Sequence, residues 1–193
     1  AVSPLMKFDP TKPFQIESEP KNPVPVRFAG SDASWRPEAL IAGPDGKVFV
    51  GAVSGYGKLG GGLVMWDPER GQVEQFLQVV KDQSVISLAS WKNLVVGGTT
   101  IGGGGGSHPT QTEARVFLWD PKTKQKTFET VAVPRASKVN NLVTAKNGLV
   151  YGMAGQTLFV FDPAKKAIID RREMPFRATV YNAIAEGADG KLW

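Results

Sequence analysis

Three side chains of this 193-residue chain are candidates for general acid–base chemistry: Tyr56, His108 and Tyr181. His108 is the only histidine, and imidazole is the side chain whose ordinary pKa lies closest to neutrality. A tyrosine held beside a substrate could accept a proton while a histidine donates one. Tyr181 or Tyr56 is therefore a candidate base and His108 a candidate acid. The alternative is that the tyrosines pack or line a channel, and that His108 lies on a mobile, glycine-rich surface loop.

Arginine side chains could supply the positive charge that such chemistry, or the binding of an anion, requires. A guanidinium group holds a carboxylate through two parallel hydrogen bonds. The net charge of +5 also favours anionic partners through a weak long-range field. The alternative is a basic surface that is merely solvated. The candidate ligand-binding residues are Trp35, Arg36, Arg135, Asn140 and Arg177.

The sequence does not favour a metal or an organic cofactor. It contains no cysteine and one histidine, so a zinc or copper centre is not expected. Its repeated aspartates stand in separate turns, whereas calcium needs clustered oxygen ligands. The glycine run at 102–106 is not followed by the Lys-Ser/Thr pair of a P-loop. We therefore predict no metal site, no cofactor, no nucleic-acid partner and no membrane partner.

The elements that must position these side chains repeat along the chain. An aromatic residue followed by Asp-Pro recurs at Phe8, Trp66, Trp119 and Phe161, at intervals of roughly 40 to 60 residues. Each motif separates two apolar runs, which predicts a strand, a turn and a second strand. Asp-Gly, Lys-Asn or Asn-Gly pairs predict another hairpin ahead of three motifs and again at the end. A unit of four strands, which we name A, B, C and D in chain order, therefore repeats.

This repeat predicts an all-β fold, a β-propeller of four-stranded antiparallel blades. Its two incomplete ends are complementary, and propellers close by joining such ends in one blade. We therefore expect a single propeller domain or propeller fragment, equivalent to four blades. It would form part or half of a seven- or eight-bladed propeller, completed by a longer chain or in a homodimer. The expected divisions are a C-D half blade at 1–22, complete blades at 35–80, 81–133 and 134–174, and an A-B half blade at 175–193.

The segment "DGKVFVG…GGLVMWDPERGQVEQF" resembles the repeat of bacterial β-propellers of the YVTN, PQQ-like and lactonase-like kind. The Trp-Asp pairs at 66–67 and 119–120 also resemble a WD repeat, although no Gly-His pair precedes them. In such propellers ligands usually bind on the face built from the D-to-A and B-to-C connections. The resemblance thus implies that the candidate residues share that face. It also implies a bacterial protein in a secreted or periplasmic location.

From this resemblance we expect a ligand-binding module that is not catalytic by itself. Its basic, aromatic-bearing face would meet an acidic polysaccharide or a protein partner. One alternative is part of a propeller-fold enzyme, either a polysaccharide lyase acting on uronate-containing glycans or a lactonase-like hydrolase. In the lyase, a tyrosine or histidine removes the proton beside the carboxylate and an arginine stabilises the developing charge. The other alternative is a purely structural assembly unit.

Overall fold

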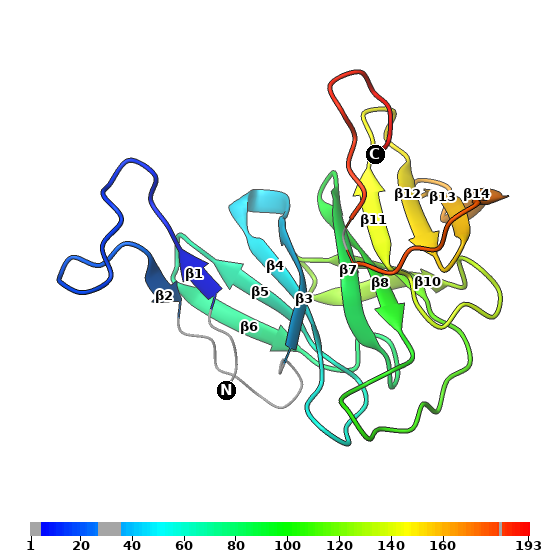
Figure 1. Cartoon of the computed structure of the whole chain (residues 1–193), viewed down its shortest axis with the longest axis horizontal. Helices are drawn as coiled ribbons and strands as arrows, with labels where there is room; N and C mark the ends of the chain where they lie inside the picture. Colours follow the sequence, from blue (N-terminus) through cyan, green and yellow to red (C-terminus); the bar gives the residue numbers. More distant parts are fainter. Residues whose placement is uncertain (1–4, 27–35, 182) are drawn as a thin grey trace.

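The computed structural model describes residues 5–26, 36–181 and 183–193, and three four-stranded antiparallel sheets dominate this part of the chain (Figure 1). The first blade contains β3 (Arg36–Ala42), β4 (Val48–Val53), β5 (Leu63–Asp67) and β6 (Gln72–Phe76). The second contains β7 (Ser84–Trp91), β8 (Leu94–Thr100), β9 (Val116–Asp120) and β10 (Gln125–Thr130). The third contains β11 (Asn141–Thr144), β12 (Val150–Ala154), β13 (Thr157–Asp162) and β14 (Ala167–Glu173). These are the predicted A, B, C and D strands of three propeller blades.

The turns between strands C and D of the three blades have the predicted chemistry. Asp162 begins the turn between β13 and β14, and its carboxylate accepts hydrogen bonds from the backbone N–H groups of Ala164 (3.0 Å) and Lys165 (3.1 Å). The bond from Lys165 lowers the pKa of Asp162. Asp67 and Asp120 accept equivalent bonds in the other two blades. The repeated aspartates therefore close turns, which explains why they stand so far apart in the sequence.

The blades pack face to face, and successive side chains of strand C in the second blade point into the two neighbouring cores. Phe117 and Trp119 of β9 belong to the core between the first and second blades. Their neighbours Val116 and Leu118 point the other way, into the core between the second and third blades. The innermost strand β7 contacts β3 and β4 on one side and β11 on the other. The second blade is thus covered on both faces.

The N-terminal half blade differs from the prediction. A hairpin was expected directly across the Asp9-Pro10 turn, but β1 (Leu5–Lys7) pairs with β2 (Val24–Val26) instead. Asn22 explains the difference: its buried side-chain amide donates to the backbone oxygens of Asp9, Lys12 and Pro13. These bonds fold the residues between the strands into a long loop, and Pro13 has no N–H to offer a ladder. The N-terminal half blade therefore includes residues beyond the expected boundary at 22.

A hairpin that lies within residues 185–193, here called the C-terminal hairpin, ends the chain. Ala185 and Trp193 exchange two backbone hydrogen bonds of 3.0 and 2.9 Å, and Glu186 pairs with Leu192. The carboxylate of Glu186 accepts a 2.9 Å bond from the backbone N–H of Lys146, so this hairpin lies along the A-B hairpin of the third blade. The two half blades are at opposite ends of the molecule (Figure 1). One copy therefore does not join them into a fourth blade.

The described residues contain no helix that is long and apolar enough to cross a membrane. The single 3₁₀ turn that they contain, η2 (Pro44–Gly46), joins β3 to β4.

Candidate functional site

A hollow of about 550 Å³ opens on the face that the D-to-A and B-to-C connections build. One wall is the connection between β10 and β11, at residues 133–138. Another is the short turn between β12 and β13, at residues 155–156, and the third is the segment that follows β14, at residues 177–179. Three connections from different parts of the chain therefore meet there. We refer to this feature as the basic hollow.

Backbone hydrogen bonds fix the walls of the basic hollow. Ile101 donates to the carbonyl oxygen of Ser137 (3.1 Å), and Val139 donates to that of Thr99 (2.8 Å), so the first wall is fastened to the end of β8. On the opposite side, Ala178 donates to the carbonyl oxygen of Gly155 (2.8 Å). The walls are loops, but these backbone hydrogen bonds hold them in place. The side chains on the walls therefore have defined positions.

Three cationic residues of the described chain line the basic hollow, and all three are exposed: Arg135, Lys138 and Arg177. Arg135 has a positive φ of 64°, and the Glu113 carboxylate accepts a 2.9 Å bond from its backbone N–H. This bond holds the turn in a conformation that few side chains adopt. Among the described lining residues, Glu173 is the one acidic residue. Positive charge therefore predominates.

The floor and the margin of the hollow are polar. Asn140, which is 4% exposed, contributes to the lining. At the margin, the Lys138 ammonium lies 3.2 Å from the Tyr181 hydroxyl and 5.6 Å from the centre of its ring. The structure thus brings together three of the predicted ligand-binding residues, Arg135, Asn140 and Arg177, and places one candidate base beside them.

The other two predicted ligand-binding residues are not part of this lining. Arg36 begins β3 in the first blade, and its Nε lies 2.6 Å from the Glu38 carboxylate. Trp35 lies outside the described residues. Arg36 is thus already paired with a carboxylate two residues away.

Tyr56 and His108 lie on a different pair of loops. The loop that carries His108 packs against the B-to-C connection of the first blade: Gly104 donates to the carbonyl of Lys58 (3.0 Å), and Gly57 donates to that of Gly105 (2.9 Å). A Cβ at Gly104 would lie 1.8 Å from the Gly55 oxygen, so the glycine run permits close contact between two backbones. The glycine run is therefore a packed segment in this structure.

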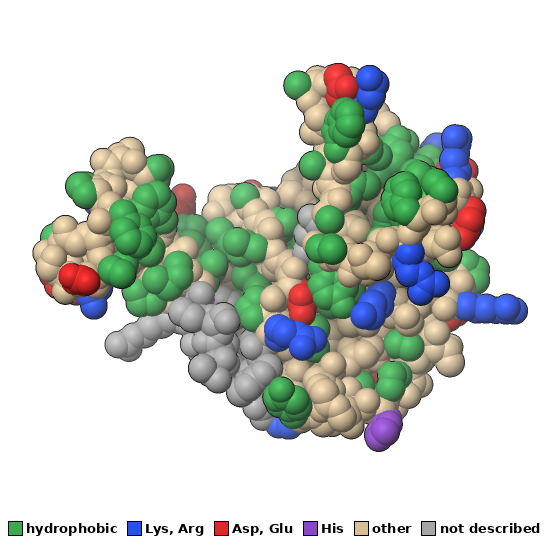
Figure 2. All heavy atoms as spheres, viewed as in Figure 1, with side chains coloured by type: hydrophobic (Ala, Val, Ile, Leu, Met, Phe, Trp, Pro, Cys, Tyr) green, Lys and Arg blue, Asp and Glu red, His purple; other side chains and the backbone are tan. Residues whose placement is uncertain are grey.

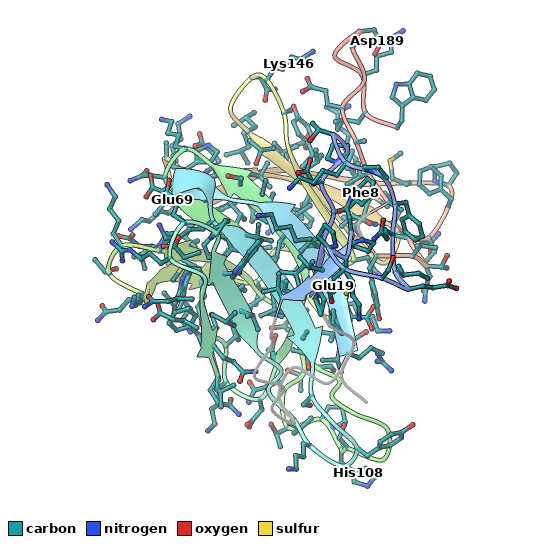
Figure 3. All side chains as sticks on the ribbon, turned by 90° about the vertical axis from the view of Figure 1, so that its left-hand side faces the viewer. Phe8, Glu19, Glu69, His108, Lys146 and Asp189 are labelled. Carbon is teal, nitrogen blue, oxygen red and sulfur yellow. The ribbon has the colours of Figure 1, made fainter. Side chains whose placement is uncertain are left out.

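His108 is exposed and lies at the outer edge of its loop (Figure 3). It does not line the basic hollow, and neither does the exposed Tyr56. The structure thus separates the candidate acid from Tyr181, which lies beside Lys138. The assignment of these three residues to catalysis stays a prediction.

Thr157 and Glu173 are among the lining residues that the sequence analysis did not single out. The Thr157 hydroxyl lies 3.2 Å from the Glu173 carboxylate, across the paired ends of β13 and β14. The short connection between β12 and β13 could have indicated these residues. It places the ends of both strands at the face on which the hollow opens. Within the described part of the chain, no group of three or more His, Asp or Glu side chains is arranged to hold a metal ion.

The fold is that of a β-propeller, and comparison with solved structures agrees. The WD40 repeats of RRP9 superpose with a TM-score of 0.58 at 13% identity, over 84% of this chain and 48% of theirs. U3-55K gives a TM-score of 0.58 at 14% identity, over 84% of this chain and 49% of its own. This chain thus spans about half the length of both. No protein-family model matches the sequence, and no curated protein sequence matches it.

These likenesses support the predicted propeller and do not distinguish the bacterial repeat families that the sequence resembles. At 13–14% identity they concern the fold alone. The function must therefore be argued from the site.

Proposed function

We propose that this chain is a non-catalytic binding module whose basic hollow holds an acidic segment of a partner protein. The observation that carries this proposal is the convergence of Arg135, Lys138 and Arg177 from two separate connections on one 550 Å³ hollow. Guanidinium and ammonium groups so placed bind carboxylates by charge-assisted hydrogen bonds. Binding loops that a rigid β-scaffold holds in place are a common arrangement in protein recognition.

The lining favours a peptide over a sugar. Its apolar contribution comes from small aliphatic side chains such as Val133, Ala136 and Ala154. None of the described lining residues is aromatic, and Tyr181 lies at the margin. Sugar rings are usually held against flat aromatic faces, whereas an extended peptide needs small side chains and nearby polar groups. Asn140 at the floor and Lys138 at the rim supply polar groups of that kind. An acidic glycan would contact the same cationic groups, so the experiment also tests a glycan as ligand.

The test measures the affinity of fluorescent peptides by anisotropy, with a Glu/Asp-rich peptide, its Lys/Arg-rich counterpart and fluorescent polygalacturonate as ligands. We expect the acidic peptide to bind and the basic one not to bind. Arg135→Gln and Arg177→Gln should each weaken binding about tenfold, because each removes charge-assisted bonds of about 1.5 kcal/mol. Binding should also weaken as salt is raised.

Arg36→Gln is the matched control, because Arg36 is also an exposed arginine and is paired with Glu38 away from the hollow. Its effect should stay within twofold. Equal losses in Arg36→Gln and Arg177→Gln would show that only the net charge matters and would contradict the proposed site. If polygalacturonate binds more tightly than the acidic peptide, the ligand of the hollow is an acidic glycan and the proposed protein segment is wrong.

A lyase is the second candidate, because one observation favours it. The Tyr181 hydroxyl lies 3.2 Å from the Lys138 ammonium, at the rim of a hollow that carries two arginines. A base beside carboxylate-binding groups is the arrangement that proton abstraction from a uronate requires. The test is the absorbance of an unsaturated product from uronate oligosaccharides, compared between the wild type and Tyr181→Phe. If no such product forms at high protein concentration, the lyase candidate is rejected and the binding function is the one that remains.

A further inference from the structure

Side-chain amides that are buried in a protein normally have hydrogen-bond partners. Among the described residues, four such amides are buried: Asn22, Gln83, Asn140 and Asn141. The Asn22 amide donates to three backbone oxygens, and that of Gln83 donates to the carbonyl oxygen of Glu113 (2.9 Å). The Asn141 side chain accepts a 2.5 Å bond from the backbone N–H of Ala183. Three of the four amides therefore help to hold the fold together.

The amide of Asn140 is the exception. The residue is 4% exposed and lines the basic hollow, yet no hydrogen bond within the described part of the chain reaches its side chain. Its backbone N–H donates to the carbonyl oxygen of Met153 (2.8 Å), so the residue is held in place. The described side-chain atoms that are fully enclosed without a partner belong to Trp119 and Thr144, which indicates that the Asn140 amide is open to the hollow. A fixed, unpaired amide at the floor of a hollow is suited to a ligand.

Asn140 and Lys138 lie on the same side of an extended segment. Lys138 pairs with Thr100 at the end of β8, and Val139 is buried in the core between the second and third blades. The residues on either side of Val139 both line the hollow, as the alternation of an extended chain requires. Two such residues are about 7 Å apart along the segment. The hollow therefore offers a neutral amide and, two residues away, a cation.

Cationic residues share the lining with this amide. Figure 2 shows Lys and Arg side chains near the segment that follows β14, which Figure 1 shows in the same view. Arg135, Lys138 and Arg177 contribute to the lining. Their charges attract a carboxylate side chain, a uronate or a phosphate alike. Charge alone therefore does not select a peptide, and such selectivity requires a further group.

A carboxamide carries what a peptide group needs. Its oxygen accepts hydrogen bonds and its nitrogen donates two, so one side chain can accept from a peptide N–H and donate to a peptide C=O. A carboxylate can use only the donors, because it has no hydrogen to offer to the amide oxygen. In an extended ligand, every second residue is also about 7 Å away, which matches the separation of Asn140 from Lys138. The amide thus suits the main chain of such a ligand, and the cation suits an acidic side chain close to it.

We propose that Asn140 determines the specificity of the basic hollow by holding the main chain of an extended acidic segment. Its amide donates to one peptide C=O and accepts from one peptide N–H, while Arg135, Lys138 and Arg177 hold the acidic side chains. This inference rests on the proposed binding function and adds that the ligand is recognised as a peptide and not by its charge alone. An acidic glycan would contact the cations but would not make this pair of bonds.

The test is an anisotropy titration with the acidic peptide and with a series of analogues, in each of which one backbone N–H is replaced by an ester oxygen. In the wild type we expect one position of the series to lose about fivefold in affinity, because the ester cannot donate to Asn140. Asn140→Leu, which keeps a similar volume but not the amide, should weaken the parent peptide about tenfold. In that variant the ester at the sensitive position should cause no further loss. Such non-additivity identifies two groups that contact each other.

Asn141→Leu is the matched control, because the Asn141 amide is also buried but is bonded to Ala183 and is not among the described residues of the hollow. It should keep the loss at the sensitive ester position. Circular dichroism checks the fold of both variants. A measurement on the unaltered chain serves if a variant does not fold: the NMR signal of the Asn140 side-chain NH₂ group should shift when the acidic peptide is added, and that of Asn141 should not.

The outcomes separate this inference from the proposed function. If the acidic peptide binds the wild type and Asn140→Leu within twofold of each other, the hollow holds its ligand by charge, and the role of Asn140 is wrong while the binding function stands. The same conclusion follows if the ester losses are equal in the two proteins, or if the Asn140 signal does not move on binding. If the acidic peptide does not bind the wild type, both the binding function and this inference are rejected.

Discussion

The second blade and the N-terminal half blade contain the same strand C motif in opposite environments. Phe117 of the motif in β9 is fully buried, and Trp119 is 5% exposed. Met6 and Phe8 occupy the same positions at the N-terminus and are about half exposed. The local pattern is shared, so the difference comes from the neighbours: β9 lies between two blades, whereas β1 pairs with β2 alone among the described strands. In a propeller, the sequence of a strand sets which side chains face each neighbour, and the neighbour decides whether they are buried.

The largest expected effect tests this comparison directly. Phe117→Ala removes a fully buried ring from the core between the first and second blades and should reduce the free energy of unfolding by about 3–5 kcal/mol. Phe8→Ala, at an equivalent exposed site, should change it by less than about 0.5 kcal/mol when measured on the single chain at low concentration. Urea denaturation followed by tryptophan fluorescence measures both. Similar losses in the two variants would show that the half blade is as firmly packed as the second blade.

Gly97→Ala should have the next largest effect. A Cβ at Gly97 would lie 2.0 Å from the Phe117 ring, so the ring would have to move out of its core. We expect a loss of about 1–3 kcal/mol from overpacking. Gly102→Ala is the control, because its nearest neighbouring atom would be 3.5 Å away. If the loss at Gly97 comes from this contact, Phe117→Leu should relieve part of it in the double variant.

The sequence predicted what depends on local chemistry. The Asp-Pro turns and the alternation of strand C follow from residues a few positions apart, and they define three blades. The β1–β2 pairing did not follow, because it depends on the bonds that Asn22 makes to backbone groups 9 to 13 residues away. In the site, Arg135 and Arg177 were found because their connections map to one face. Glu173 was not found, because it ends a strand and joins the hollow through a contact across the sheet.

Ser87→Ala tests the packing of the second blade with a polar contact. The buried Ser87 hydroxyl donates a 2.7 Å hydrogen bond to the carbonyl oxygen of Val139, which links β7 to the segment that enters the third blade. Its removal leaves a buried acceptor without that donor, and should lower the free energy of unfolding by about 1–3 kcal/mol. Ser137→Ala, an exposed serine in the same connection, is the control. Equal effects would place Ser87 outside the cooperative core.

The smallest expected effect compares two turn aspartates, one in a complete blade and one in the half blade. The pKa of Asp162 is lowered mainly by the backbone N–H of Lys165, and that of Asp9 mainly by the Thr11 hydroxyl. A carboxylate whose folded pKa is lowered adds stability above its unfolded pKa of about 4, and this stability is lost as the pH falls through the folded value. Asp162→Asn should therefore weaken the dependence of unfolding on pH below about 4, whereas Asp9→Asn should not, because the half blade contributes little to global unfolding. Thermal melts between pH 2 and pH 6 measure both. An equal change in the two variants would mean that β1 and β2 unfold together with the three blades, and the contrast between complete and incomplete blades would then concern burial alone.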